Sequence, residues 1–474
     1  MKRILTILFT LITVLAHAQN DKDSSIEYHE SGDIIKKGLS YGPLPVVAFD
    51  ADRGFQFGAL LNLYNFGDGS TYPNPKSTWY FEASAYTKEG DIGSYKFIVN
   101  YDNKTIIPGV RMSICTGYYK DASLDFYGFN GYQSNYDMDL LKPTFQFTDK
   151  ELQNKFDEKG SMPKGFYRFS RDLIKAKIDF TGKIAKNFYW EAGYNFMWNK
   201  TGSFHPQGYS VLGNPSDPSL YAGEGGTTLF DLYKAWGIIP ESEADGGISS
   251  ALRVGLMYDS RNVENNPTKG TWAEAHIIAA PHWLGTTKGQ DHYRFNATFR
   301  QYLPIVQDKF TFAYRLSYQG FIGEAPWYLM PFYTIMGPTA DQDGIGGYRT
   351  TRGLMLNRIQ GLHTGFYNFE FRWKFVDFKL WKQNIAFTLT AFSDGTHVFK
   401  GYDMTLRPVA TATSEQISLY DKFVFNRKDG FHGSAGGGLR FIMNQNFIVA
   451  FEYAMPFNKQ DGNGAFYINT GFLF

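Results

Sequence analysis

Cysteine is almost absent from this sequence, and neither sign of charge predominates. The 474 residues include a single cysteine, Cys115, which excludes a disulfide framework and a cysteine-based metal site. Lysine and arginine total 47 and aspartate and glutamate 46, giving a formal net charge of +1. A chain without a basic excess lacks the electrostatic footprint of nucleic-acid binding. We therefore expect no nucleic acid as a partner.

Long apolar runs are also missing. The apolar stretch at residues 4–15 follows two basic residues and precedes a small-residue site at residues 16–18. This order is typical of a secretory signal peptide, so we expect residues 1–18 to be removed. No other window reaches the roughly twenty apolar residues that a membrane-spanning helix needs.

Catalytic signatures are likewise absent from the sequence. It has no HExxH or GxSxG motif, and the glycine run at residues 436–438 lacks the lysine of a phosphate-binding loop. His276 and His292 have no serine and acid partners at a recognisable spacing, and we expect them to face lipid or loop. We predict that the protein is not an enzyme, with no catalytic, cofactor-binding or metal-binding residues.

Aromatic residues and glycine are abundant. Aromatics make up 18% of the chain and glycines number 49, while 20% of the residues are charged. This combination is typical of transmembrane β-barrels, in which every second strand residue meets lipid and aromatic girdles line both interfaces.

Short segments with a period of two recur along the chain. They lie at residues 43–50, 54–66, 77–86, 93–101, 109–118, 166–180, 188–198, 248–259, 271–280, 293–302, 310–319, 365–375, 384–392, 433–442, 447–454 and 465–474. We therefore predict an all-β fold, a 16-stranded antiparallel transmembrane β-barrel over residues 43–474. A short periplasmic tail at residues 19–42 precedes it.

The lengths of the connections agree with this count. With the N-terminus in the periplasm, connections after odd-numbered strands face outside, and the long polar stretches fall there. These stretches are residues 119–165, 199–247, 320–364 and 393–432. Within the first of them, residues 149–158 predict a short helix. Most even-numbered connections are short, although residues 67–76 are long for a periplasmic turn.

Residues 365–375 show the alternation most clearly. One face carries Tyr367, Phe369, Phe371, Trp373 and Phe375, and the other carries Asn368, Glu370, Arg372 and Lys374. An aromatic face backed by charged side chains suits a membrane strand with a wet lumen better than a packed core.

Several motifs in the C-terminal half occur in a recognisable order. They are Tyr258-Asp259-Ser260-Arg261 with Pro267, Gly270 and Glu274, then Thr351-Arg352-Gly353-Leu354 with Arg358 and Gly361, then Asn368, Glu370 and Arg372, then residues 391–395 and 436–440. Together they resemble the bacterial surface antigen superfamily of outer-membrane barrels, the BamA/TamA family. The resemblance implies a sixteen-stranded barrel in the bacterial cell outer membrane, with the Arg-Gly loop folded into the lumen.

The loop motif Arg352, Gly353 and Leu354 is the main candidate site. An arginine inside a barrel needs a partner, and a carboxylate matches its planar fork. We expect Arg352 to meet Glu370 or Asp394, with Arg372 as a further inward-facing candidate. The alternative is that Arg352 lies in a mobile, solvated loop. Leu354 departs from the family, which usually has an aromatic there.

A second candidate is the periplasmic turn with Asp259, Arg261, Pro267 and Gly270. It could form a contact surface at the periplasmic rim. The alternative, which we favour, is turn chemistry that sets the strand register.

The family implies insertion or translocation of polypeptide, or of lipid, through a weak seam between the first and last strands. Members that assemble or secrete proteins carry periplasmic POTRA domains, and residues 19–42 are too short for one. The chain thus resembles a short branch lacking POTRA domains. We expect contact with outer-membrane lipid, and with periplasmic or lipoprotein partners that replace the POTRA domains. The alternative function is a passive pore or structural barrel, a surface antigen whose exposed loops bind an external partner.

Overall fold

Long antiparallel strands make up most of the described chain. The computed structural model describes residues 27, 35–50, 54–72, 74–88, 91–145, 163–204, 227–264, 266–335, 342–380, 383–443, 447–470 and 474. The strands of the main sheet are β1 (Leu39–Asp50), β2 (Gly54–Asn65), β3 (Ser77–Lys88), β4 (Asp91–Ile107), β5 (Val110–Asp125), β6 (Arg168–Ala185), β7 (Phe188–Ser203), β8 (Gly246–Asp259), β9 (Gly270–Ala280), β10 (His292–Val306), β11 (Phe310–Gly323), β14 (His363–Leu380), β15 (Gln383–Lys400), β16 (His432–Met443), β17 (Phe447–Pro456) and β18 (Ala465–Thr470). Each overlaps one predicted segment, so the predicted all-β fold with sixteen antiparallel strands is confirmed.

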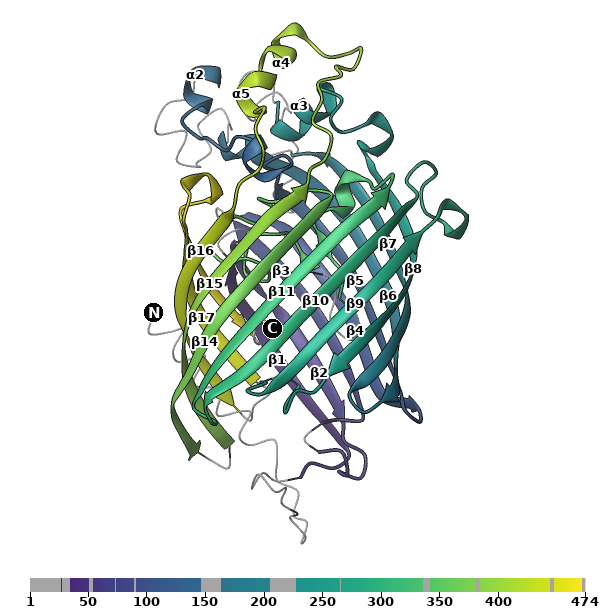
Figure 1. Cartoon of the computed structure of the whole chain (residues 1–474), viewed down its shortest axis with the longest axis vertical. Coiled ribbons are helices and arrows are strands. Elements are labelled where there is room, and N and C mark those ends of the chain that lie inside the picture. Colours follow the sequence, from purple (N-terminus) through teal and green to yellow (C-terminus); the bar gives the residue numbers. More distant parts are fainter. Residues whose placement is uncertain are drawn as a thin grey trace.

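The strands form one sheet that closes into a barrel (Figure 1). Neighbours follow the chain order, and β1 meets β18 to complete the circle. The short strands β12 (Phe332–Tyr333) and β13 (Gln342–Asp343) form a separate two-stranded ribbon within the β11–β14 connection. Each main-sheet strand from β2 to β17 thereby has a hydrogen-bonded neighbour on both sides, as backbone in hydrocarbon requires.

No helix in the described part of the chain is long and apolar enough to cross a bilayer.

Most strands extend beyond their predicted segments, by up to eight residues at the end of β15, and two of these differences are informative. β1 begins at Leu39 and pairs with β2 from there, so the last four residues of the expected tail belong to the barrel. β5 continues to Asp125, well beyond the predicted end at residue 118. Its last five residues are all buried, because protein covers both faces of the strand there. The alternation that reveals a membrane strand therefore fades at this tip.

The two faces of the sheet have opposite character. On β14, Phe369, Phe371 and Trp373 face outward and are 39%, 45% and 51% exposed, whereas Asn368 and Glu370 face the lumen and are fully buried. Burial of charged side chains inside the barrel shows that protein groups fill the lumen at this level.

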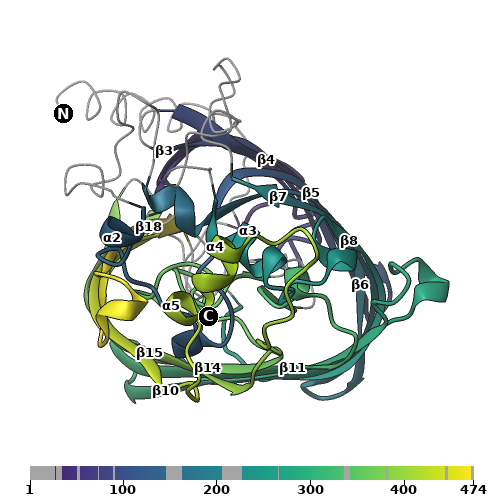
Figure 2. The same cartoon turned by 90° about the horizontal axis from the view of Figure 1, so that it is seen from above.

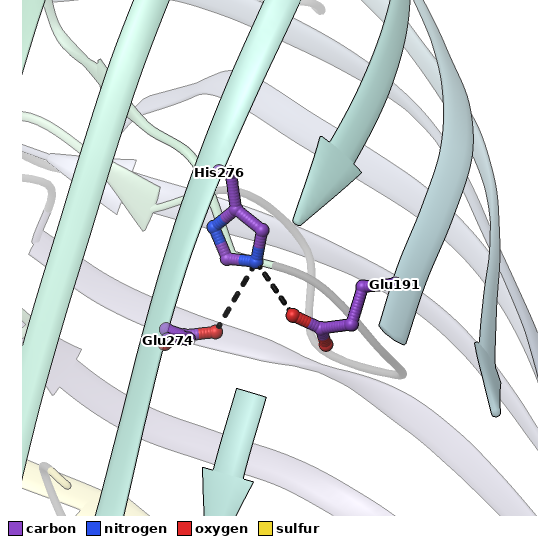
Figure 3. A group of neighbouring side chains, drawn as sticks. All are labelled: Glu191, Glu274 and His276. Carbon is purple, nitrogen blue, oxygen red and sulfur yellow. Dashed lines mark hydrogen bonds and ion pairs between the residues drawn. The ribbon is translucent and has the colours of Figure 1, made fainter. Parts of the chain in front are cut away.

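The two histidines expected at lipid or loop positions are instead buried, which corrects that prediction. His276 and His292 are each 1% exposed. His276 shares the lumen face of β9 with Glu274 (Figure 3), whereas the next residue, Ile277, faces outward and is 57% exposed. Residues two apart on a strand face the same side, so the spacing of His276 from Glu274 indicates that both face the lumen.

One end of the barrel carries the long connections, here called the long-loop end; the opposite end is the short-turn end. The helices of the long-loop end lie over the barrel mouth (Figure 2). The helical segments are η1 (Gly131–Gln133), α2 (Leu141–Phe145), η3 (Pro163–Tyr167), α3 (Leu229–Ala235), η5 (Glu241–Glu243), η6 (His282–Leu284), η7 (Trp327–Leu329), α4 (Ser414–Ser418), α5 (Tyr420–Phe423) and η8 (Lys459–Asp461).

These connections pack into a core of their own, here called the cap. Phe126, Tyr233 and Trp327 come from three different connections, and the ring of Phe126 lies 5.1 Å from that of Tyr233 and 5.9 Å from that of Trp327. Thr228 and Asp231 form a capping box that starts α3 and fixes its position in this core. Aromatic packing thus covers the lumen at the long-loop end. The predicted helix at residues 149–158 and the predicted signal peptide lie outside the described residues.

Candidate functional site

The connection between β11 and β14 turns from the cap into the lumen. Gly353 lies at its innermost part with φ +87°, a left-handed conformation that glycine adopts without strain. A Cβ atom at this position would lie 3.0 Å from the Cβ of Ala454 on β17. Glycine therefore lets the loop backbone approach the wall closely, with Arg352 beside it.

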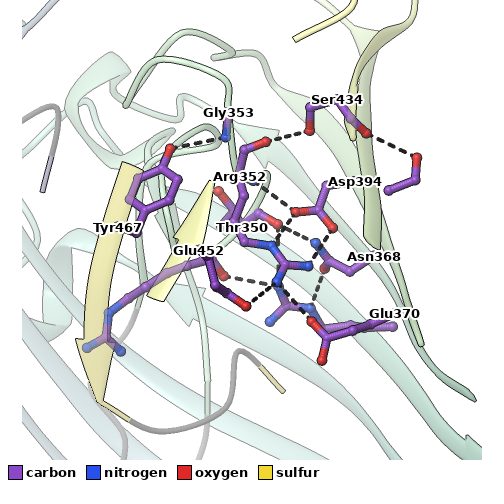
Figure 4. Close-up of polar contacts among 12 residues, drawn as sticks. Thr350, Arg352, Gly353, Asn368, Glu370, Asp394, Ser434, Glu452 and Tyr467 are labelled. Atoms are coloured by element: carbon purple, nitrogen blue, oxygen red, sulfur yellow. Dashed lines mark hydrogen bonds and ion pairs between the residues drawn. The ribbon is translucent and has the colours of Figure 1, made fainter. Parts of the chain in front are cut away.

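Arg352 meets two of its predicted partners (Figure 4). Its Nε and Nη2 donate to the two oxygens of Asp394 at 2.8 and 3.0 Å, and its backbone N–H donates to Asp394 at 3.0 Å. Its Nη1 donates to Glu370 at 2.8 Å and to Glu452 at 3.1 Å. All four side chains are completely buried. Arg352 is thus held by three carboxylates from β14, β15 and β17.

Two further arginines complete this cluster, here called the arginine–carboxylate network. Arg440 on β16 donates to Glu370 at 2.7 and 2.9 Å and to Glu452 at 2.6 Å. Arg372 donates to Glu370 at 2.6 Å. Three cations therefore face three anions, Asp394, Glu370 and Glu452, and the charges balance. A buried charge set is tolerated when each member is paired and hydrogen-bonded, as here.

Packing reinforces the network from the side. The guanidinium carbon of Arg352 lies 3.4 Å from the ring centre of Phe392, a cation–π contact. Gly436 on β16 makes room for this ring, because a Cβ at that position would overlap the Phe392 ring and the Tyr453 carbonyl. Ser434 donates its hydroxyl to the Arg352 carbonyl, and Gly353 donates its N–H to the Tyr467 hydroxyl at 3.1 Å. The loop thus touches every strand from β14 to β18.

Comparison with known proteins decides the family. The sequence matches the Omp85 superfamily domain over residues 116–474. The chain belongs to the Omp85 superfamily. The resemblance to the bacterial surface antigen superfamily of outer-membrane barrels is thereby confirmed.

One solved structure shows the same fold at low identity. The Omp85 barrel is similar to BamA from Haemophilus ducreyi lacking POTRA domains 1–3, with 13% identity and a TM-score of 0.51 over 98% of this chain and 78% of that chain. It also matches CdiB from Escherichia coli, with 10% identity and a TM-score of 0.49 over 92% of this chain and 62% of that chain. No curated protein matches the sequence.

Arg372 and Leu354 occupy places that the sequence had not settled. Arg372 does not bond to Arg352, since two cations repel; it shares Glu370 with Arg352 and also donates to the carbonyl of Phe474 at 3.0 Å. Leu354 is 1% exposed and packs in an apolar cluster of the loop and wall. An aliphatic side chain therefore fills the position at which the family usually has an aromatic one.

The loop of this Omp85 barrel also holds the cap. Arg358 donates to the carbonyls of Gln460, Gly131 and Ser134 at 2.8, 3.0 and 3.2 Å. These acceptors lie on the β17–β18 and β5–β6 connections, so one loop joins the lumen network to the closed long-loop end.

A buried carboxyl group clamps the cap from another side. Glu243, from the β7–β8 connection, accepts the backbone N–H of Trp327 at 2.9 Å and faces the Tyr402 hydroxyl at 3.5 Å. The indole N–H of Trp327 donates to the Glu243 carbonyl at 3.0 Å. Burial raises the pKa of the Glu243 carboxyl to about 7, because no cation balances the charged form.

The second candidate site, the turn after β8, contains mainly contacts within the turn. Arg261 donates to both oxygens of Asp259 at 2.9 and 2.6 Å. Pro267 is buried, and Gly270 has φ +110°, where a Cβ would overlap the carbonyl of Ser260. These contacts match turn chemistry that sets the register of β8 and β9. Glu264 also reaches Arg111 on β5 at 3.0 Å, so the turn crosses the lumen mouth.

The closing contact between β1 and β18 is much thinner than its neighbours. Among the described residues, the two strands pair at one position, Phe49 with Ile468. In contrast, β1 pairs with β2 along its entire length. Pro43 and Pro45 lie in β1, and proline is found on strands with an unpaired side because it cannot donate a backbone hydrogen bond. This contact is the seam.

Sequence reasoning missed Glu452 and gave Arg440 no role. Both lie on strands with clear alternation, and the outward neighbours of Glu452, Phe451 and Tyr453, are 40% and 47% exposed. A lone carboxylate between two lipid-facing aromatics was the signal that could have identified Glu452 as a lumen group.

Proposed function

We propose that this Omp85 barrel inserts or translocates polypeptide in the bacterial outer membrane by opening between β1 and β18. The observation that carries the proposal is the seam, whose two strands pair at one position among the described residues, Phe49 with Ile468. A strand pair with few hydrogen bonds opens at lower free energy than a fully paired one, and its free edges can pair with an incoming strand.

The arginine–carboxylate network supports an opening on the β1 side. Arg352 and Gly353 bind side chains from β14, β15, β17 and β18, and Ser434 of β16 binds the loop backbone. The loop thus stiffens the last five strands as a unit and ends at the seam. When the seam opens, the loop stays with β18 and β1 moves away.

The filled lumen argues against the alternative of a passive pore. The loop occupies the lumen at the level of Glu370, and the cap packs above it. A barrel closed in this way serves transport only if a part of it moves.

Partners and orientation form part of the proposal. The long-loop end faces outside, the short-turn end faces the periplasm, and outer-membrane lipid surrounds the aromatic outer face. Periplasmic or lipoprotein partners would deliver clients in place of POTRA domains. We propose no catalytic activity and no nucleic-acid partner.

Depletion of the protein in its own cells tests this function. We expect the levels of other outer-membrane proteins to fall, or lipid asymmetry to shift if the client is lipid. A pull-down of the tagged barrel would identify periplasmic or lipoprotein partners. Unchanged protein levels and unchanged asymmetry after depletion would favour the passive class.

A further inference from the structure

Three potential metal ligands meet in the lumen away from the arginine–carboxylate network. Glu191 projects from β7, and Glu274 and His276 project from β9 toward the same point (Figure 3). One ligand atom from each lies within 4.8 Å of the others. The three side chains are 4%, 4% and 1% exposed.

The strand β8, which lies between β7 and β9, leaves room for these side chains to approach each other. Gly255 on β8 pairs with Glu191 on one side and with His276 on the other. A Cβ at position 255 would overlap the imidazole of His276 and the carbonyl of Ala275. Because Gly255 has no side chain, Glu191 on β7 and His276 on β9 can approach each other across β8. Because all three ligands stand on paired strands, their positions are preorganised.

Hydrogen bonds within this group do not join His276 to both carboxylates. The His276 Nε2 lies 2.8 Å from Glu191 Oε2 and 3.9 Å from Glu274 Oε2. One N–H can serve only one of these carboxylates, and the second distance is beyond a hydrogen bond. Arg300 donates to Glu274 Oε1 at 2.7 Å, which orients the carboxylate so that Oε2 faces His276.

Polar atoms without a hydrogen-bond partner occur on His276 itself and on the residue paired with it. In the described structure His276 Nδ1 has no hydrogen-bond partner, and neither amide atom of Asn296 has one. Asn296 is fully buried and pairs with His276 across β9 and β10. Buried polar groups are rarely left unpaired, and an orphaned amide beside such a cluster is an independent sign of a missing small polar ligand.

We propose that Glu191, Glu274 and His276 bind one divalent transition-metal cation, with Zn²⁺ as the representative ion. One imidazole and two carboxylates form a nitrogen and oxygen donor set that suits zinc and its first-row neighbours. Tetrahedral ligands with bonds of about 2.1 Å lie roughly 3.4 Å apart, and the observed 2.8 and 3.9 Å fall on either side of that value. This proposal revises the expectation of no metal-binding residue.

The position of the site suggests what the ion does. In the order of the sheet, β9 is the eighth strand from the seam counted from β18 and the ninth counted from β1, so the site is opposite the seam. The cation links β7 to β9 across β8 and stiffens the wall that must stay closed when the seam opens.

Metal titration of the untagged full chain in detergent micelles tests the proposal. After treatment with a chelator, Zn²⁺ added in a calorimeter should bind at one equivalent. Glu191→Gln and His276→Ala should weaken binding by more than about 100-fold, the upper end of the loss caused by removing an outer-shell partner. His282→Ala, at an exposed loop histidine, should leave the affinity unchanged.

Co²⁺ absorption gives a second readout, since visible bands report nitrogen and oxygen coordination at the ion itself. Heat-modifiable gel migration shows whether each variant is folded. If His276→Ala does not fold, the isosteric variant Glu274→Gln replaces it in the titration. Absence of zinc binding by the wild type, or equal binding by the wild type and the Glu191→Gln and Glu274→Gln variants, would overturn the proposal.

Discussion

Replacing Arg352 with alanine should release the loop from the lumen. In the described structure, Asp394 receives all its hydrogen bonds from Arg352, and two of the three come from the guanidinium. The Arg352→Ala variant keeps three buried carboxylates but only two arginines, Arg372 and Arg440. The network would then carry an uncompensated negative charge in a site with no exposure.

The magnitude follows from this imbalance. Removing one partner of a buried ion pair is destabilising by about 3–5 kcal/mol. Because each 1.4 kcal/mol is tenfold, the equilibrium for loop docking should shift by about 100-fold to 5000-fold toward the released state. In the double variant Arg352→Ala/Asp394→Ala the shift toward the released loop should be smaller, because the carboxylate left without its partner is also removed.

Single-channel recordings in planar bilayers measure the release. The wild type should show low, flickering conductance, and Arg352→Ala should show larger and longer openings. Arg349→Ala is the matched control, because Arg349 lies in the same loop and its side chain is exposed. Equal conductance in the wild type and Arg352→Ala, or steady large openings in the wild type, would refute the conclusion that the docked loop closes the lumen.

Two other predictions concern the network's support and the cap. Gly436→Val should push the Phe392 ring from under Arg352 and lower the free energy of unfolding by about 1–3 kcal/mol, measured by heat-modifiable migration against temperature; an unchanged transition would contradict the crowding at this position. The Glu243 carboxyl, with its pKa raised from 4.5 to about 7, binds more protons in the folded cap than in the unfolded one between these values. Cap stability should therefore be full below about pH 4.5 and fall by about 3 kcal/mol as pH rises through 7. Protection factors of the cap amides, which correct for intrinsic exchange, check this at pH 5 and 8, and Glu243→Gln should abolish their difference; equal protection of the wild-type cap at both pH values would contradict it.

The strands were predictable because their signal is local. Alternation needs only the residues of one strand, and lipid on one side enforces it on all sixteen. The signal failed where lipid is absent, as at the tip of β5, where residues up to Asp125 are buried on both faces. The cap has no period, since its aromatics, such as Phe126 and Trp327, come from separate irregular connections.

The site was predictable only in part for a related reason. Arg352 and its partners Glu370 and Asp394 stand in motifs with a known order along the chain. Glu452 and Arg440 enter through the register of β16 and β17, which brings residues from distant motifs to one point. The group around His276 depends likewise on Gly255, whose role is visible only once its two neighbouring strands are placed.

The seam is the central claim, and a disulfide across it is the most direct measurement. In a Cys115→Ser background, Phe49→Cys/Ile468→Cys should lock β1 to β18, and Leu389→Cys/Leu439→Cys on the fully paired β15 and β16 is the control. Levels of other outer-membrane proteins are then measured in cells in which only the locked protein is present. We predict that they fall as on depletion and recover with a reductant, while the control pair has no effect. Normal levels with a fully locked seam would contradict the account.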